Sequence, residues 1–273
     1  MTPLADNPAP TAPSDATWAA AAFQDKVAFV TGAASGVGRA TATAFAAAGA
    51  RVALVDLDDR GCEDLAAQLA CPADRLLVAR CDVTQAQQVE AAVAATVARW
   101  GRLDCAANAA GLEGATRPLL DEDETLYDRT MEVNVRGVWH CMRAQIAQLL
   151  HQGGGGSVVN VSSGAGLVGS ARSAVYSASK HAVIGLSRSA ALQYARQGVR
   201  INVVCPAGVD TPMAQRIVAS FPGGPPSRGG ASYPLGRYST AAEVASGILW
   251  LSSPGAASTT GSVLAIDAGF TAA

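Results

Sequence analysis

Short runs of β-branched and aliphatic residues alternate with longer alanine-rich amphipathic stretches from Lys26 onward. Strands separated by helix-length segments are typical of βαβ units, whose crossovers return the chain to the same edge of a parallel sheet. No repeat of fixed period interrupts the alternation. The pattern therefore predicts an α/β protein. The expected strands are Val27–Thr31, Arg51–Asp56, Leu76–Arg80, Cys105–Asn108, Ser157–Val161, Arg200–Val204 and Ser262–Ile266.

Length and composition favour one ordinary globular domain. The chain has 273 residues, of which 49% are hydrophobic, so a full core needs no disulfide or metal. Twenty Lys and Arg stand against 22 Asp and Glu, which gives a net charge of −2. That balance lacks the basic excess expected of a protein that binds nucleic acid or an anionic membrane. A small molecule is the expected partner.

Cysteine usage and the absence of long apolar runs indicate the compartment. No stretch reaches about 18 consecutive apolar residues, and the first 22 residues hold neither a basic residue nor the apolar core of a secretory signal. The six cysteines form no C-x-x-C pair and are expected to be reduced and largely buried. These features predict a cytoplasmic protein without a membrane span. The cysteines are Cys62, Cys71, Cys81, Cys105, Cys141 and Cys205.

Two segments depart from the alternation. Residues 1–22 are proline-rich and poor in apolar residues, which predicts a disordered tail ahead of a single domain over 23–273. The segment Pro212–Pro234 is rich in Gly and Pro and long for a loop, so a lid is favoured over a surface insertion. Helix ends are expected at a C-capping Gly49 and at two N-terminal capping boxes, Thr84–Gln87 and Thr240–Glu243.

A glycine-rich turn follows the first expected strand and opens the first helix. It reads Thr31-Gly32-Ala33-Ala34-Ser35-Gly36-Val37-Gly38. Glycines let the backbone turn tightly and approach a pyrophosphate, whose charge then lies on free N–H groups at the positive end of the helix. A lone glycine triplet is weak evidence, but its position between a strand and a helix favours a dinucleotide site.

The second expected strand ends in Asp56, about 24 residues after Gly32. An acidic side chain near this separation hydrogen-bonds the adenosine ribose hydroxyls and repels a 2′-phosphate. Ser35 and Leu57 occupy the positions from which a Lys or Arg could accept that phosphate. The sequence therefore predicts NAD rather than NADP.

Tyr176 and Lys180 stand four residues apart in an expected helix, and Ser163 precedes them at the end of an expected strand. Side chains at i and i+4 share a helix face, so the ammonium can stand near the phenol. A nearby cation favours phenolate, which predicts that the pKa of Tyr176 falls from about 10 toward neutrality. Alone, Y-x-x-x-K is more often a surface pair. The neighbouring motifs favour a proton acceptor.

In order along the chain, these motifs resemble the short-chain dehydrogenase/reductase family in its compact one-domain form. The resemblance covers nearly everything after Phe23. It implies a doubly wound, Rossmann-like α/β fold with a parallel sheet of about seven strands between two helical layers. The motifs are Thr31–Gly38, Cys81-Asp82-Val83, Asn108-Ala109-Ala110-Gly111, Asn134-Val135-Arg136-Gly137, Val161-Ser162-Ser163, Tyr176-x-x-x-Lys180, Asn202–Pro206 and Thr211-Pro212-Met213.

The resemblance implies a catalytic tetrad of Asn134, Ser163, Tyr176 and Lys180. Tyr176 would exchange the alcohol proton, and Ser163 would hydrogen-bond the substrate oxygen. Lys180 would lower the pKa of Tyr176 and hold the nicotinamide ribose. Asn134 would order a water that relays protons.

The resemblance also implies where NAD would bind. Asp82 and Val83 would border the adenine, and Thr211 would contact the nicotinamide carboxamide. Ala109 and Ala207 replace the family's usual Asn and Gly, which leaves every reacting group in place. The expected cofactor-binding residues are Gly32, Ser35, Gly36, Val37, Gly38, Asp56, Leu57, Asp82, Val83, Asn108, Ala109, Gly111, Tyr176, Lys180, Pro206, Val209, Thr211 and Met213.

Other chemistries lack their residues in this sequence. His140, His151 and His181 do not pair at metal-ligand spacing, so no metal site is expected. No G-x-S-x-G elbow of a serine hydrolase occurs. Glu113 follows the Asn108–Gly111 turn, near where the family places substrate. It is a candidate site residue, against the simpler interpretation of a solvated loop carboxylate.

The expected function is hydride transfer between NAD(H) and a secondary alcohol or ketone, by a chain that the resemblance implies is a homotetramer. Two alternatives stay open: a 3-oxoacyl carrier-protein reductase, although Gln148–Gly156 offers no basic docking residue, and a noncatalytic NAD-binding protein. Met213, Ile217 and Phe221 recur at helical spacing. If this stripe faces the pocket, the substrate is a small, largely apolar cyclic or aryl-alkyl alcohol or ketone; otherwise the stripe is core.

Overall fold

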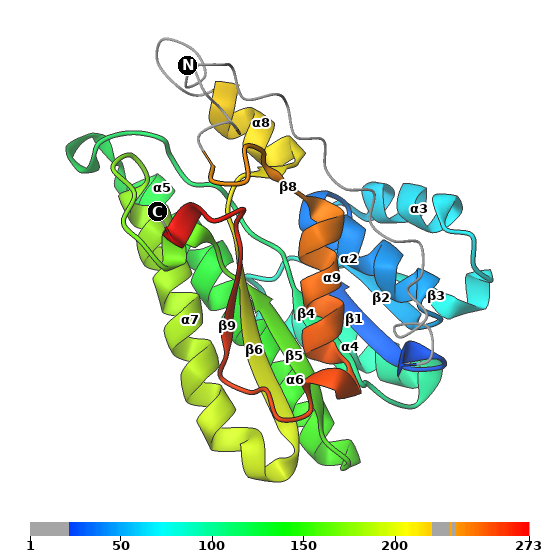
Figure 1. Cartoon of the computed structure of the whole chain (residues 1–273). Helices are drawn as coiled ribbons and strands as arrows, with labels where there is room; N and C mark the ends of the chain where they lie inside the picture. Colours follow the sequence, from blue (N-terminus) through cyan, green and yellow to red (C-terminus); the bar gives the residue numbers. More distant parts are fainter. Residues whose placement is uncertain (1–21, 220–229, 231–232, 273) are drawn as a thin grey trace.

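A seven-stranded, fully parallel sheet forms the centre of the molecule (Figure 1). The structure is a computed structural model, and it describes residues 22–219, 230 and 233–272. The strand order is β3-β2-β1-β4-β5-β6-β9. Every expected strand is found, with its ends within two residues of the prediction. The strands are β1 (Val27–Thr31), β2 (Arg51–Asp56), β3 (Leu76–Arg80), β4 (Cys105–Asn108), β5 (Gly156–Val161), β6 (Val199–Pro206) and β9 (Val263–Ile266).

Helices cover both faces of the sheet, which confirms the predicted fold class (Figure 1). One face packs against α2 (Gly36–Ala47), α3 (Asp59–Gln68) and α9 (Ala241–Ser252), and the other against α4 (Ala86–Trp100), α6 (Val138–Gln152) and α7 (Ala174–Tyr194). Two shorter helices are α5 (Glu124–Met131) and α8 (Pro212–Ala219). None of the helices in the described part of the chain is long and apolar enough to cross a membrane.

The two helical layers create two hydrophobic cores, one on each side of the sheet. Along β1, Ala28 and Val30 belong to one core and Phe29 to the other. Successive side chains of a strand point to opposite faces, so a strand covered on both sides must be apolar throughout. This explains why the expected strands are continuous apolar runs rather than alternating ones.

Helix ends match two of the three predicted caps. Gly49 follows α2 with φ of +83°, and Thr240 and Glu243 form the capping box of α9. The capping box predicted at Thr84–Gln87 is wrong, because α4 begins at Ala86 and its N-cap residue Gln85 makes no side-chain cap. The N–H and hydroxyl of Thr84 donate instead to Asp82, at 2.9 and 2.8 Å. A carboxylate two residues upstream is the stronger local acceptor.

The segment after β6 contains more regular structure than predicted. Its first part, Pro212–Ala219, is helix α8, on which Met213 and Ile217 are half buried. Phe221 and the Gly/Pro-rich residues that follow it lie outside the described residues, so the lid stays a prediction. The disordered tail predicted over 1–22 also lies outside them, apart from Ala22.

The topology predicts a binding crevice at the carboxyl ends of the central strands. Strand β1 lies between β2 and β4, so the crossovers leave the centre in opposite directions. In open parallel sheets, ligands bind at the carboxyl ends of the strands where the order reverses in this way. The glycine-rich turn, Asp56 and Asn108 all lie at this edge, at the ends of β1, β2 and β4.

Candidate active site

The glycine-rich turn is required by close backbone approach at the end of β1. Gly32 has φ of +70°, and a side chain there would come within 2.9 Å of the main chain at Ala109 and Ala110. A side chain at Gly38 would run into the carbonyl oxygen of Gly32. Only glycine therefore lets β1, α2 and the end of β4 meet at this spacing.

The start of α2 fits a negatively charged group. The N-cap residue Ser35 makes no side-chain cap, so its hydroxyl does not occupy the first N–H groups of the helix. A side chain at Gly36 would lie 3.5 Å from Thr211, so the missing Cβ leaves space between the turn and the segment after β6. An open space at a positive helix end fits a pyrophosphate. The residues present therefore fit a bound dinucleotide.

Asp56 is held rigidly beside this turn. One carboxylate oxygen accepts the N–H of Ala34 at 3.0 Å, and the other accepts the N–H of Asp58 at 3.0 Å. The neighbouring Leu57 is exposed. Asp56 is half buried, so its carboxylate both ties the turn to β2 and faces the crevice edge. The predicted contact with a ribose stays a prediction.

Asp82 and Val83 follow β3 and form one wall of the crevice edge. The side chain of Val83 is buried, and a side chain at Gly137 would lie 2.7 Å from it. The carbonyl oxygen of Val83 is 3.1 Å from Nδ1 of His140. This packing fixes an apolar surface beside the Asp82 carboxylate, where the family resemblance implies the adenine.

Asn108 points into the core rather than toward the crevice. Its Nδ2 donates to Gln145 at 2.9 Å and to Asn160 at 2.8 Å, and its Oδ1 accepts from Gln145 at 2.8 Å. Asn160 in turn donates to Ser187 at 2.8 Å. We call Asn108, Gln145, Asn160 and Ser187 the amide cluster. The Asn108 side chain therefore crosslinks β4, β5, α6 and α7, which leaves the main chain of Asn108 for the predicted contact with the cofactor.

Ser163, Tyr176 and Lys180 come together at the carboxyl end of β5, and we call them the reactive cluster. Tyr176 and Lys180 lie on one face of α7, with Lys180 Nζ 5.6 Å from the centre of the Tyr176 ring. Lys180 is buried, and its Nζ donates to the carbonyl oxygen of Val161 at 3.1 Å. A hydrogen bond joins the Ser163 and Tyr176 side chains. The spacing predicted from sequence thus brings a phenol, a hydroxyl and an amine to one place.

The pKa values of this cluster differ from the sequence prediction. Burial raises the pKa of Tyr176 above its usual value, and the hydrogen bond from Ser163 only partly offsets the rise. Burial lowers the pKa of Lys180 to about 8. The expected lowering of the Tyr176 pKa by Lys180 is therefore wrong for the protein without cofactor. Tyr176 is half buried, and desolvation by burial is the largest cause of the rise in its pKa, whereas Lys180 Nζ lies 5.6 Å from the ring centre.

Asn134 lies within a π-helical turn, Glu132–Gly137, between α5 and α6. Its Oδ1 accepts the N–H of Leu112 at 2.8 Å, and its Nδ2 donates to the Leu112 carbonyl and to Ser179, both at 3.0 Å. A side chain at Gly111 would lie 3.2 Å from Asn134 and 3.4 Å from Lys180 Nζ. Asn134 therefore fixes the loop after β4 beside the reactive cluster. The water relay stays a prediction.

Known proteins match almost the whole chain. Residues 32–271 match a family model described as enoyl-(acyl carrier protein) reductase. A 2,5-dichloro-2,5-cyclohexadiene-1,4-diol dehydrogenase from Sphingobium indicum is 40% identical over 247 residues, 90% of this chain and 97% of that protein. The chain belongs to the short-chain dehydrogenase/reductase family. A cis-4-hydroxycyclohexanecarboxylate dehydrogenase from Sinomonas cyclohexanicum is 39% identical over 251 residues, 92% of this chain and 98% of that protein.

Solved structures agree with this assignment. Levodione reductase has a TM-score of 0.87 at 35% identity, over 92% of this chain and 99% of that one. A 3-ketoacyl-(acyl-carrier-protein) reductase from Brucella melitensis, complexed with NADH, has a TM-score of 0.83 at 29% identity, over 91% and 99%. ElxO with NADP bound has a TM-score of 0.84 at 28% identity, over 92% and 100%. The predicted family and oxidoreductase class are confirmed, and a nicotinamide cofactor is supported without a choice between NAD and NADP.

In this short-chain dehydrogenase/reductase, the chain leaves β6 at Pro206 and continues along the carboxyl ends of the strands, beside the expected crevice. Val209 pairs with Ser239 in a short parallel ladder, β7 (Val209–Asp210) with β8 (Ser239–Thr240). The hydroxyl of the buried Thr211 donates to the Val209 carbonyl and accepts the N–H of Ala214, both at 3.3 Å. This arrangement directs α8, and with it Met213, over the carboxyl edge of the sheet.

Three residues of the site were not predicted from sequence. Ser179 and Leu112 hold Asn134, and Arg216 on α8 pairs with Glu113. Ser179 lies inside the Tyr176–Lys180 motif, three residues after Tyr176 and so close to the same helix face, which is a signal that could have found it. No local signal identifies Arg216, whose partner is 103 residues away in the chain.

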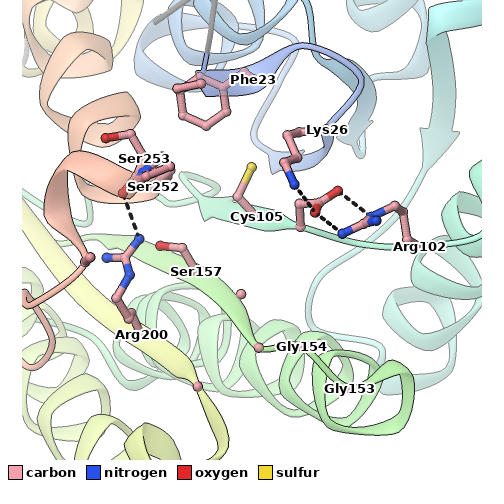
Figure 2. A pocket seen from close by; sticks show the side chains of 17 residues that line it. Phe23, Lys26, Arg102, Cys105, Gly153, Gly154, Ser157, Arg200, Ser252 and Ser253 are labelled. Carbon is pink, nitrogen blue, oxygen red and sulfur yellow. Dashed lines mark hydrogen bonds and ion pairs between the residues drawn. The ribbon is translucent and has the colours of Figure 1, made fainter. Parts of the chain in front are cut away.

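A separate cavity of about 310 Å³ opens at the opposite edge of the sheet (Figure 2). Lys26, Cys105, Ser157 and Arg200 line it, and they stand before β1 or at the amino ends of β4, β5 and β6. Arg200 donates to the Leu251 carbonyl at 2.7 Å and to the Ser253 carbonyl at 3.3 Å, and so caps the end of α9. Figure 2 draws the contact with Ser253. None of the expected site residues is among its described lining. We therefore assign no catalytic role to this cavity.

Proposed function

We propose that this enzyme transfers hydride between NAD(H) and a cyclic secondary alcohol or ketone, with Tyr176 as the proton-transfer group. The observation that carries the proposal is the reactive cluster, because it places a hydrogen-bonded phenol and a buried amine beside a turn that fits a dinucleotide. A protein that only bound NAD would need the turn but not the cluster.

Each residue of the cluster has a defined task in this proposal. Tyr176 takes the proton from the alcohol oxygen or returns it to the ketone oxygen, and Ser163 hydrogen-bonds the same oxygen. Lys180 bonds the ribose and carries the cluster's positive charge, and Asn134 holds the loop beside it. When bound, the nicotinamide supplies the carbon that accepts or gives the hydride.

The raised pKa of Tyr176 sets the direction of the pH dependence. Because the phenol is protonated at neutral pH, it is ready to donate a proton in ketone reduction. Alcohol oxidation requires the phenolate, so its rate should increase with pH up to the pKa of Tyr176 in the complex. Reduction should be fastest at neutral or lower pH and decline as the solution becomes alkaline.

The substrate class rests on the relatives and on the apolar residues over the crevice. The two dehydrogenases named above act on six-membered ring compounds, by their names. The half-buried Met213 and Ile217 on α8 offer an apolar surface at the same edge of the sheet. A panel of cyclic, aryl-alkyl and linear secondary alcohols, followed by NADH formation, tests the proposal. Turnover of none of the alcohols or their ketones would refute it.

A 3-oxoacyl carrier-protein reductase remains the second candidate function. The match to a model described as an acyl carrier protein reductase and the likeness to the Brucella melitensis structure support it. The same panel decides between them when a 3-oxoacyl carrier protein is included. Preference for that carrier-bound ketone over ring ketones would favour the second candidate.

The preference for NAD rests on Asp56, whose carboxylate would accept ribose hydroxyls and repel a 2′-phosphate. Arg39 lies near the turn, but its guanidinium donates to the Ala34 carbonyl at 3.2 Å and to Gln68 at 2.8 Å. We expect kcat/KM with NAD to exceed that with NADP by at least about tenfold, and Asp56→Ala to narrow the gap by weakening NAD. Equal efficiency of the two cofactors in the wild type would contradict this preference.

We also propose a homotetramer located in the cytoplasm. Trp250 and Phe270 near the edge strand β9, and Tyr127 and Trp139 on α5 and α6, are large apolar side chains exposed in the single chain, which supports subunit contacts there. All six cysteines are free, as expected in a reducing compartment. Native mass spectrometry measures the oligomeric state, and a monomer would contradict the tetramer.

A further inference from the structure

An ion pair connects the loop after β4 to α8, across the edge of the sheet that holds the reactive cluster. Arg216 Nε lies 2.6 Å from one carboxylate oxygen of Glu113, and Nη2 lies 3.2 Å from the other. A two-point contact between a guanidinium and a carboxylate fixes the orientation of both groups. Glu113 contributes the more enclosed side chain, with 21% exposed against 58% for Arg216.

The Glu113 loop packs directly against Tyr176. A side chain on the next residue, Gly114, would lie 3.4 Å from Tyr176 Cβ and 3.4 Å from the hydroxyl of Thr130. The negative charge of Glu113 is one of the causes that raise the pKa of Tyr176. A change in the charge of Glu113 is therefore felt at the phenol.

Few other charged groups face these two residues. Ser163, Glu113 and the buried thiol of Cys205 act on the pKa of Tyr176, and Lys180 stands 5.6 Å from the ring centre. Burial raises the pKa of Glu113, but Arg216 from α8 and Arg129 from α5 help to lower it below its usual value, and of these two cations Arg216 is the one that hydrogen-bonds the carboxylate. Arg216 is thus the principal counter-charge to the carboxylate on the loop that packs against Tyr176.

We propose that Arg216 is a positioning residue for proton transfer, which acts on Tyr176 by neutralising Glu113 while α8 is seated over the crevice. Losing the contact removes the counter-charge from the Glu113 carboxylate, whose negative charge raises the pKa of Tyr176, so the phenolate needed for alcohol oxidation becomes harder to form. The position of α8, which carries Arg216, is thereby coupled to the pKa of Tyr176. The inference rests on the proposed role of Tyr176.

Opposite charge changes at the two partners test this coupling in the full chain with NAD saturating. In Arg216→Gln the pH at which kcat/KM for alcohol oxidation has risen to half of its maximum should move to higher pH by about 0.5 to 1 unit. In Glu113→Gln it should move to lower pH by a similar amount, because the charge itself is removed. The double variant should resemble Glu113→Gln, and Arg216→Lys should recover part of the Arg216→Gln shift.

A merely structural ion pair would give a different result. In that case both single variants would change KM or the melting temperature in the same direction, and the pH at half-maximal kcat/KM would stay that of the wild type. That outcome would overturn the inference. Exposed ion pairs contribute little to stability, so we expect unfolding of Arg216→Gln to stay close to that of the wild type. Arg51→Gln is the matched control, because it breaks an exposed ion pair with Asp25 at the amino ends of the strands. It should leave the pH at half-maximal kcat/KM unchanged.

A direct titration separates this inference from the proposed function. The ring resonance of Tyr176, labelled with a heavy carbon isotope and identified by its loss in Tyr176→Phe, reports the phenol without any substrate. Its titration should move to lower pH in Glu113→Gln relative to the wild type. A shift in a protein that oxidises no alcohol would reject the proposed function alone, whereas turnover without any shift would reject the coupling alone.

Discussion

The amide cluster and the reactive cluster are both polar, both enclosed and separated by only a few residues along β5 and α7. Side chains of the amide cluster satisfy one another and nearby main chain at 2.6 to 2.9 Å. In the reactive cluster the phenol and the amine have few partners, and burial shifts both of their pKa values. Full satisfaction makes a polar group structural, whereas incomplete satisfaction leaves it poised for chemistry.

The largest effect should come from the reactive cluster. Tyr176→Phe keeps the ring and its packing but removes the exchangeable proton. We expect kcat to fall about a thousandfold, while NADH binding, followed by cofactor fluorescence, persists. The melting temperature should change little. Turnover within about tenfold of the wild type would show that another group moves the proton.

The amide cluster should respond in stability instead. Asn108→Ala leaves Gln145 and Asn160 with unpaired polar atoms in the core, which should cost about 2 to 4 kcal/mol in the free energy of unfolding. Denaturant titration measures this loss, and cofactor affinity of the folded fraction should be nearly unchanged. If the free energy of unfolding stayed unchanged and only cofactor binding were lost, the Asn108 side chain would be a cofactor contact. The amide cluster would then not be purely structural.

A smaller effect should distinguish the clusters through pH. In the folded protein without cofactor, the pKa of Lys180 is about 8, below its ordinary value of 10.5. Between these values the unfolded chain binds more protons, so this group makes stability rise with pH across that window. The unfolding free energy of the wild type, relative to Lys180→Met, should rise by on the order of 2 kcal/mol from pH 8 to 10.5.

Lys26→Met is the control for that comparison, because Lys26 is the other lysine of the chain and is 45% exposed. A constant difference between the wild type and Lys180→Met across the window would mean that the Lys180 amine is not desolvated. Of the two reactive-cluster groups, only Tyr176 would then have a pKa shifted by burial.

Features set by neighbouring residues could be predicted from the sequence. The strands followed from continuous apolar runs, and the Thr240–Glu243 box followed from a spacing of three residues. The glycine positions and the Tyr176–Lys180 pair are likewise local patterns, so they identified the crevice edge and the reactive cluster. The family resemblance added Asn134, whose place beside Lys180 no spacing reveals.

Features set by distant partners could not be predicted in this way. The side chain of Asn108 turns inward because Gln145, 37 residues later, offers it a matching amide. The pKa of Tyr176 depends on how much protein surrounds its hydroxyl, which the four-residue spacing to Lys180 does not contain. Even the local prediction at Thr84 was wrong. The predicted box needed the Gln87 side chain to accept the Thr84 N–H, but the Asp82 carboxylate is the stronger hydrogen-bond acceptor and takes it.

In the proposed reaction a hydride moves from a ring alcohol carbon to a nicotinamide. The most direct test supplies a cyclic secondary alcohol carrying deuterium at the carbinol carbon, together with NAD and the full-length enzyme. We expect mass spectrometry to find the reduced cofactor one mass unit heavier, and we expect Tyr176→Phe to form almost none of it. Reduced cofactor without deuterium, or an equal yield from Tyr176→Phe, would contradict the proposed reaction.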